Sequence, residues 1–385
     1  MIPVTLGTGN WGFKMRKILG SLLTLVLLAG CASTSDVEEV SSAAQESQVE
    51  ADEDNSPPAK DGDAEDLPPK SMEELAEEYP EEWAKQLTMI AVLLEEASTR
   101  DPYPMDFLAS PNTDLEQADA VEKKIRDATK LWGNFYAGEI PLAVTVVHPN
   151  DKEWYLERWE ALGRDNAGEE WFGKALGQGG GGGVGWNDYD QIPHMYFMFS
   201  DRFKPINLKA DLFAHETTHF FQILAFGDSL GDQGGTCWIG EGSAEFIGLA
   251  GKYSGNFASI EEDLALNLKE YSRTRQAVAE GILRHHQADE TRTLAEGLSD
   301  DILLMTRTDR ECGYPSGAML GYKLGMFVTE KFMVDFDLQA LVDFFHALRG
   351  QPVKAAFETA TGLDYEQWVR QDLVPYLEQE FTKTP

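Results

Sequence analysis

The chain has 385 residues, of which 42% are hydrophobic, so it is long enough to bury a core and is not disordered as a whole. Its 66 acidic residues outnumber its 32 basic ones, and a net charge of −34 would repel the phosphates of a nucleic acid. Three cysteines are too few for a fold built on disulfides. These numbers leave a soluble, acidic, globular protein, and they predict that nucleic acids are not among its partners.

The first 31 residues have the order of a secretory signal, with a basic segment, an apolar run over 18–28 and then Leu28-Ala29-Gly30-Cys31. The last four residues resemble a bacterial lipobox. That resemblance implies cleavage before Cys31 and acylation of its thiol, so that acyl chains anchor the protein to a membrane. A short transmembrane anchor is the alternative, although the apolar run is shorter than the roughly 20 residues that span a bilayer. Met15 is a second candidate for the start, and Ala32 after the cysteine would suggest the outer membrane in bacteria that sort lipoproteins by that position.

Residues 32–70 contain twelve acidic residues and two lysines with hardly any large apolar side chains. This composition is typical of a disordered, self-repelling tether, which leaves residues 71–385 as the folded part. There, Glu, Ala and Leu at helix-like spacing predict helices over 71–99 and 113–135, separated by a proline-containing break at 101–111.

The next segments predict a small sheet. Residues 140–147 and 195–199 have the β-branched or apolar character of buried strands, with a helix over 153–162 after the first of them. Residues 177–185 are almost all glycine and lack the Lys-Ser/Thr of a phosphate-binding loop, so we expect a flexible loop. Everything from Leu208 onward has helical character. Strands early and helices late predict an α+β domain, in which a small mixed sheet precedes a helical lobe.

A motif with metal-binding chemistry lies in the first of these later helices. His215-Glu216-Thr217-Thr218-His219 has two histidines four residues apart, and a helix would present both imidazoles to one zinc ion, with Glu216 beside the open coordination position. Downstream, Glu241 is the predicted third ligand. Glu245, one turn later, could accept a hydrogen bond from the far nitrogen of a ligating histidine. Without a metal, the histidines would be core residues and the two later glutamates would complement the start of a helix.

The H-E-x-x-H motif followed by Trp238-x-x-Glu241-Gly242-x-Ala244 resembles the gluzincin metallopeptidases, in particular the aminopeptidase-N-like branch and the families described as peptidase MA-like. The similarity extends over about residues 113–376. It implies a zincin-like metallopeptidase domain with the zinc site between the sheet and the helical lobe. Its expected parts are N-terminal helices, the sheet with the zinc-site helices, and the C-terminal lobe, over residues 71–135, 136–250 and 251–385.

The resemblance also implies roles for individual residues. One zinc ion per chain would be bound by His215, His219 and Glu241. Glu216 would act as general base toward the attacking water, and Tyr314 would donate a hydrogen bond to the oxyanion, although a tyrosine there could equally be a packing residue. The sequence lacks the Gly-x-Met-Glu-Asn motif with which aminopeptidases of that branch hold a free N-terminus. The expected activity is therefore endopeptidase cleavage of peptide or protein substrates.

Other residues carry further expectations. If residues 195–199 form the edge strand, they would pair with a substrate backbone. An exported compartment is oxidising, so Cys237 and Cys312 could form a disulfide that joins the segments of the third ligand and the tyrosine. The remaining histidines are expected to be exposed rather than ligands; those considered are His148, His194, His285, His286 and His346.

Two other hypotheses stay open. The protein could be a catalytically inactive lipoprotein that keeps the gluzincin fold as a binding module, or a zinc hydrolase that acts on a non-peptide amide or ester. In every case the lipobox implies a lipid-anchored protein of the bacterial cell envelope. Ala32 favours the outer membrane under the sorting rule named above, with the protein facing the periplasm or the cell surface.

Overall fold

A computed structural model describes the sheet and most of the helices of the chain. The described residues are 93, 100–133, 135–136, 140–162, 167–177, 181–185, 194–199, 210–227, 238–253, 264–287, 291–304 and 320–382. The expected signal peptide with Cys31, the tether, Cys237, Cys312 and Tyr314 lie outside them, as does all but Leu93 of the helix expected over 71–99. Within these ranges, no helix combines the length and the apolar character needed to cross a membrane.

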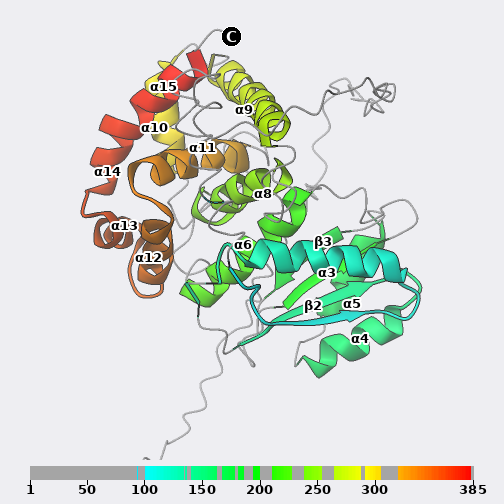
Figure 1. Cartoon of the computed structure of the whole chain (residues 1–385). Coiled ribbons are helices and arrows are strands. Elements are labelled where there is room, and N and C mark those ends of the chain that lie inside the picture. Colours follow the sequence, from blue (N-terminus) through cyan, green and yellow to red (C-terminus); the bar gives the residue numbers. More distant parts are fainter. Residues whose placement is uncertain are drawn as a thin grey trace, which may run out of the picture.

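Four short strands form one mixed sheet (Figure 1). The order is β1-β2-β4-β3, in which β1, β2 and β4 run parallel and β3 runs antiparallel to β4. The two predicted strands are present as β2 and β4, each within two residues of the expected start. The bounds are Met105–Ala109 for β1, Leu142–Val147 for β2, Gly181–Gly185 for β3 and His194–Met198 for β4.

The sheet corrects three expectations. β1 lies in the segment expected to be only a break, and its alternate residues Met105, Phe107 and Ala109 pack against the core. β3 lies where a glycine loop was expected. A Cβ on Gly182 would be 2.3 Å from Cδ1 of Phe197, so a glycine is what allows β3 to lie against this aromatic ring. Because β1 and β3 occupy the outer positions of the described sheet, they are its edge strands, and β4, which lies between β2 and β3, is not.

Helices cover both faces of the sheet (Figure 1). Val144 of β2 and Phe197 of β4 face the main core together with α3 and α6, whereas Val147 and Tyr196 face α4 and α5 on the other side. The helices expected over 113–135 and 153–162 are α3 and α4, while α5 was not predicted. The bounds are Leu115–Thr129 for α3, Lys152–Ala161 for α4, Ala167–Gly177 for α5 and Ala210–Phe226 for α6.

The described residues from 210 onward are helical or lie in turns between helices, as predicted. Aromatic side chains dominate the core of this lobe. Trp238 stacks on Phe344 with ring centroids 5.7 Å apart, and its Nε1 donates to the hydroxyl of Tyr365 at 3.1 Å. With the sheet first and this lobe second, the described chain has an α+β architecture. The helices are η2 Trp238–Gly242, α8 Ser243–Tyr253, α9 Leu264–Gln287, α10 Leu294–Leu304, α11 Leu320–Asp335, α12 Leu338–Leu348, α13 Val353–Thr361, α14 Tyr365–Trp368, η3 Val369–Leu373 and α15 Val374–Thr382.

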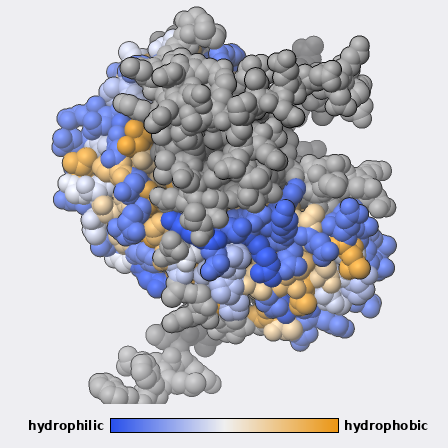
Figure 2. Space-filling model, viewed as in Figure 1, coloured by the Kyte–Doolittle hydropathy of each residue, from blue (hydrophilic) through white to orange (hydrophobic). Residues whose placement is uncertain are grey.

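The surface seen in Figure 2 has small groups of hydrophobic residues between hydrophilic ones. Single exposed apolar side chains are ordinary in soluble proteins and do not mark a site. The large hydrophobic side chains exposed in the described ranges lie on different elements; they are Leu108, Leu115, Leu176, Val334 and Leu363. The buried polar cluster between α6 and η2 is therefore a better candidate for function than this surface.

Candidate metal centre

The two histidines of the motif lie on α6, a helix held firmly between the sheet and the lobe. The side chain of Phe213 on this helix is fully buried in the core. The hydroxyls of Thr217 and Thr218 donate to backbone carbonyls four residues earlier, at 2.6 and 2.9 Å, so these buried polar groups are satisfied within the helix. This packing fixes the directions in which His215 and His219 extend.

Glu241 comes from η2, a π-helical turn that continues directly into α8. Such turns often occur at functional sites. Helix α11 approaches this turn backbone to backbone, since a Cβ on Gly242 would lie 2.4 Å from the carbonyl carbon of Gly325. The position of Glu241 therefore depends on how closely α11 packs.

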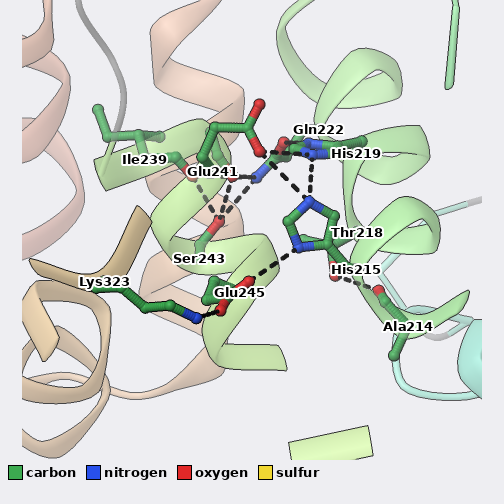
Figure 3. A network of polar contacts seen from close by, with 11 residues as sticks. Ala214, His215, Thr218, His219, Gln222, Ile239, Glu241, Ser243, Glu245 and Lys323 are labelled. Atoms are coloured by element: carbon green, nitrogen blue, oxygen red, sulfur yellow. Dashed lines mark hydrogen bonds and ion pairs between the residues drawn. The ribbon is translucent and has the colours of Figure 1, made fainter. Parts of the chain in front are cut away.

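His215, His219 and Glu241 each direct one potential metal-ligand atom to the same place (Figure 3). These three atoms are called the donor group. His219 Nε2 lies 3.0 Å from His215 Nε2 and 3.2 Å from Glu241 Oε2. His215 Nε2 lies 3.3 Å from the same carboxylate oxygen. Ligands about 2.1 Å from one tetrahedral ion lie about 3.4 Å from each other, so the separations fit a shared ion. The structure thus brings His215, His219 and Glu241 together as a group that can hold a metal ion.

The charges of this group favour a cation where the donor atoms meet. Burial alone would lower the pKa of His219, but the Glu241 carboxylate outweighs it and raises the pKa of His219 to about 9. Burial likewise opposes ionisation of Glu241, yet the nearby His219 and His215 hold the pKa of Glu241 well below its usual range. The buried carboxylate therefore stabilises positive charge at this point.

Glu216 lies on the same helix and is buried beside the donor group. Burial raises the pKa of Glu216, and the neighbouring His215 and His219 oppose that rise. Within the described part of the chain, its Oε2 has no hydrogen-bond partner. A buried carboxylate oxygen without a partner is costly, so this atom marks a place where a water or a substrate group would be bound.

A second polar group lies against the far nitrogen of each histidine (Figure 3). Gln222 Oε1 is 2.8 Å from His219 Nδ1. Glu245 Oε2 is 3.7 Å from His215 Nδ1, which is ion-pair distance but too long for the expected hydrogen bond, and Lys323 pairs with the other oxygen of Glu245. Gln222 and Lys323 were not predicted. The position of Gln222 three residues after His219, on the same helix face, could have indicated it, whereas nothing local points to Lys323.

Tyr322, on α11, is a described tyrosine whose ring lies near His215. Its partly buried ring is nearly parallel to that of His215, with centroids 6.4 Å apart. Tyr314, the tyrosine expected from the family pattern, lies outside the described residues.

The expectation that the other histidines are exposed was only partly right. His285 and His346 are exposed and His148 is partly buried, but His194 and His286 are buried. His194 Nε2 contacts the Thr145 hydroxyl at 2.7 Å inside the sheet. None of these five histidines belongs to a metal-binding group in the ranges that the structure describes.

Comparison with protein-family models and with curated proteins found no match.

Proposed function

We propose that the protein is a zinc-dependent metallopeptidase of the gluzincin type, an endopeptidase that hydrolyses peptide bonds in peptides or proteins. The observation that carries the proposal is that His215, His219 and Glu241 bring one potential ligand atom each to the same place, beside Glu216, whose Oε2 has no hydrogen-bond partner among the described residues. Two imidazoles and one carboxylate form a donor set typical of a catalytic zinc site that keeps a fourth position open. Nitrogen ligands also favour zinc over magnesium or calcium, which prefer oxygen ligands alone.

A zincin-like fold is part of the proposal. The order of elements supports it, because a small mixed sheet precedes the helix with both histidines and the third ligand follows on the next described helical segment. The motif in the sequence supports the same assignment, since H-E-x-x-H and the downstream glutamate occur in the gluzincin order.

Zinc in this position would act as a Lewis acid toward water and toward the substrate carbonyl. Glu216 would accept a proton from the attacking water at Oε2 and pass it to the nitrogen of the leaving amine. A tyrosine hydroxyl would donate to the carbonyl oxygen as it becomes negative, which is worth about 2.7 to 4 kcal/mol for donors of this kind. Tyr314 is the candidate from the family pattern, and Tyr322 is a second candidate because its ring faces His215.

The edge strand β3 is the proposed site for the substrate backbone. An extended peptide can add to the free edge of a sheet through main-chain hydrogen bonds. β3 packs against α6, the helix of the two histidines, and in the described ranges it pairs only with β4. With four glycines among its five residues, it offers backbone rather than bulky side chains. This arrangement favours a substrate bound along its chain, as an endopeptidase requires.

We also propose that acyl chains on Cys31 anchor the protein in the bacterial envelope, facing the periplasm or the cell surface. The lipobox-like residues 28–31 and the acidic composition of 32–70 support this location. A disulfide between Cys237 and Cys312 stays a prediction, which a thiol titration of denatured, unreduced protein would test.

The substitution Glu216→Gln tests the function. Zinc per chain, measured by elemental mass spectrometry, should stay near one. Cleavage of an unfolded protein substrate should fall about 10²- to 10⁴-fold, the usual contribution of a general base. Glu160→Gln, an exposed change on α4, is the matched control and should leave activity unchanged.

Two results would contradict the proposal. Folded wild-type protein that takes up no zinc would exclude the metal site. Zinc-loaded protein without peptidase activity would favour the binding module or a hydrolase of other bonds. Tyr314→Phe and Tyr322→Phe, compared in the same assay, would show which hydroxyl serves the oxyanion.

A further inference from the structure

Gln222 joins the two elements that carry the donor atoms (Figure 3). It lies on α6 and is 1% exposed. Its Oε1 is 2.8 Å from His219 Nδ1, and its Nε2 lies 3.0 Å from the carbonyl oxygens of both Ile239 and Gly240 and 2.7 Å from the Ser243 hydroxyl. Both ends of the amide are therefore occupied, one by a histidine and the other by the turn η2.

The partners of the amide determine which way it points. Backbone carbonyls only accept hydrogen bonds, so the group that faces Ile239 and Gly240 must be the NH₂ of Gln222. The oxygen then faces His219, and because it cannot donate, His219 Nδ1 must carry the proton. This leaves Nε2 of the neutral imidazole with a lone pair, on the side of His215 and Glu241.

The same amide nitrogen also fixes the turn. Its acceptors Ile239 and Gly240 immediately precede Glu241, and the hydroxyl of Ser243, which donates to the Ile239 carbonyl, completes the network two residues after it. A side chain must be a donor and an acceptor at once to make these contacts. An ionised glutamate lacks the donor, methionine has no donor and only a weakly accepting sulfur, and asparagine is one methylene shorter.

We propose that Gln222 is a positioning residue that couples the ligands, fixing the metal-binding tautomer of His219 with its oxygen and the place of Glu241 with its nitrogen. The inference rests on the proposed metal site, and it adds that tight metal binding needs Gln222 as well as the three ligands. Groups that orient metal ligands in this way typically change metal affinity by about 10- to 100-fold.

The experiment compares Gln222→Met with wild-type full-length protein and with Gln339→Met, a matched change at an exposed glutamine on α12. Zinc affinity is measured by competition with a chromogenic chelator, coordination by the visible spectrum of the Co²⁺ form, and folding by circular dichroism without metal. We expect Gln222→Met to bind zinc about 10- to 100-fold more weakly and to change the Co²⁺ spectrum, while Gln339→Met matches wild type.

Unchanged zinc affinity in Gln222→Met would overturn the inference, and so would weaker binding with an unchanged Co²⁺ spectrum, which indicates general destabilisation. If Gln222→Met is unfolded without metal, Gln222→Asn takes its place under the same criteria. Wild-type protein that binds no zinc would instead refute the proposed function itself. Wild-type protein that binds zinc but has no peptidase activity would refute the proposed peptidase alone, and the zinc affinity and Co²⁺ spectrum of Gln222→Met would still decide the role of Gln222.

Discussion

The contact between α11 and η2 leads to a prediction about a residue that contacts no ligand atom. A Cβ on Gly325 would lie 2.8 Å from the Cα of Trp238 and 2.9 Å from the Cα of Gly242. Ordinary carbon contacts begin near 3.5 Å, so Gly325→Ala would push the turn and the helix apart by about 0.6 to 0.7 Å. Overpacking of this kind lowers the free energy of unfolding by about 1 to 3 kcal/mol, and the higher helix propensity of alanine raises it by about 1 kcal/mol. The expected net loss of stability is about 0 to 2 kcal/mol.

The effect on metal binding should be larger than the effect on stability. Metal ligands tolerate errors of only about 0.2 Å in their distances, and a shift of η2 displaces Glu241 from His215 and His219. We expect Gly325→Ala to fold but to bind zinc about tenfold or more weakly, by the sensitivity typical of groups around a metal site.

The assay combines thermal unfolding in the presence of a chelator with zinc competition. The matched control is Gly281→Ala on α9, where an added Cβ would meet no atom within 4 Å. This control should gain about 0.5 to 1 kcal/mol from propensity and keep its zinc affinity. If Gly325→Ala behaves like Gly281→Ala in both measurements, the reasoning from the close backbone contact is refuted.

Two further predictions concern buried polar groups away from the candidate centre. Thr145→Val removes the hydroxyl that contacts His194, so the free energy of unfolding in urea should fall by about 1 to 3 kcal/mol, and an unchanged midpoint would contradict this. Burial raises the pKa of Asp301, although the charges of Arg292 and His285 oppose that rise. In the unfolded chain the pKa of this carboxyl is about 4, so above that pH the folded state loses stability as Asp301 is forced to ionise. Asp301→Asn should therefore melt at a higher temperature than wild type at pH 7 but not below pH 4, and calorimetry showing a lower melting temperature at pH 7 would refute the argument.

Local chemistry explains what the sequence could predict. The spacing of His215 and His219 is enough to place both imidazoles on one helix face, because the geometry of a helix turn is the same in every fold. The strand β2 was also predictable, since six consecutive apolar or β-branched residues suit a strand that is buried on both faces. Glu241 was predicted as the third ligand from its place downstream of the motif, and the resemblance implied the same role. Helix geometry alone does not bring it to these histidines, because it lies on a different element.

Tertiary packing explains what the sequence could not predict. Glycine is depleted in strands, so β3 has almost no local preference for its conformation and exists because Gly182 fits against Phe197. β1 follows prolines at 102 and 104 and shows no long alternation, so its partner β2 defines it. Lys323 is separated from Glu245 by 78 residues, and their contact depends on how α11 packs against α8.

The two kinds of ligand at the candidate centre depend on different parts of the fold. His215 and His219 both lie on α6, whose side chains pack into the core beside the sheet. Glu241 depends on a turn that α11 contacts at Gly325, and the preceding Trp238 is held by Phe344 and Tyr365 of the C-terminal lobe. Zinc affinity should therefore respond to changes in that lobe more than to changes on the far face of the sheet. The variants Thr145→Val and Gly325→Ala test this difference. Both should lose stability to a similar degree, but Thr145→Val should keep the zinc affinity of the wild type and Gly325→Ala should bind zinc more weakly.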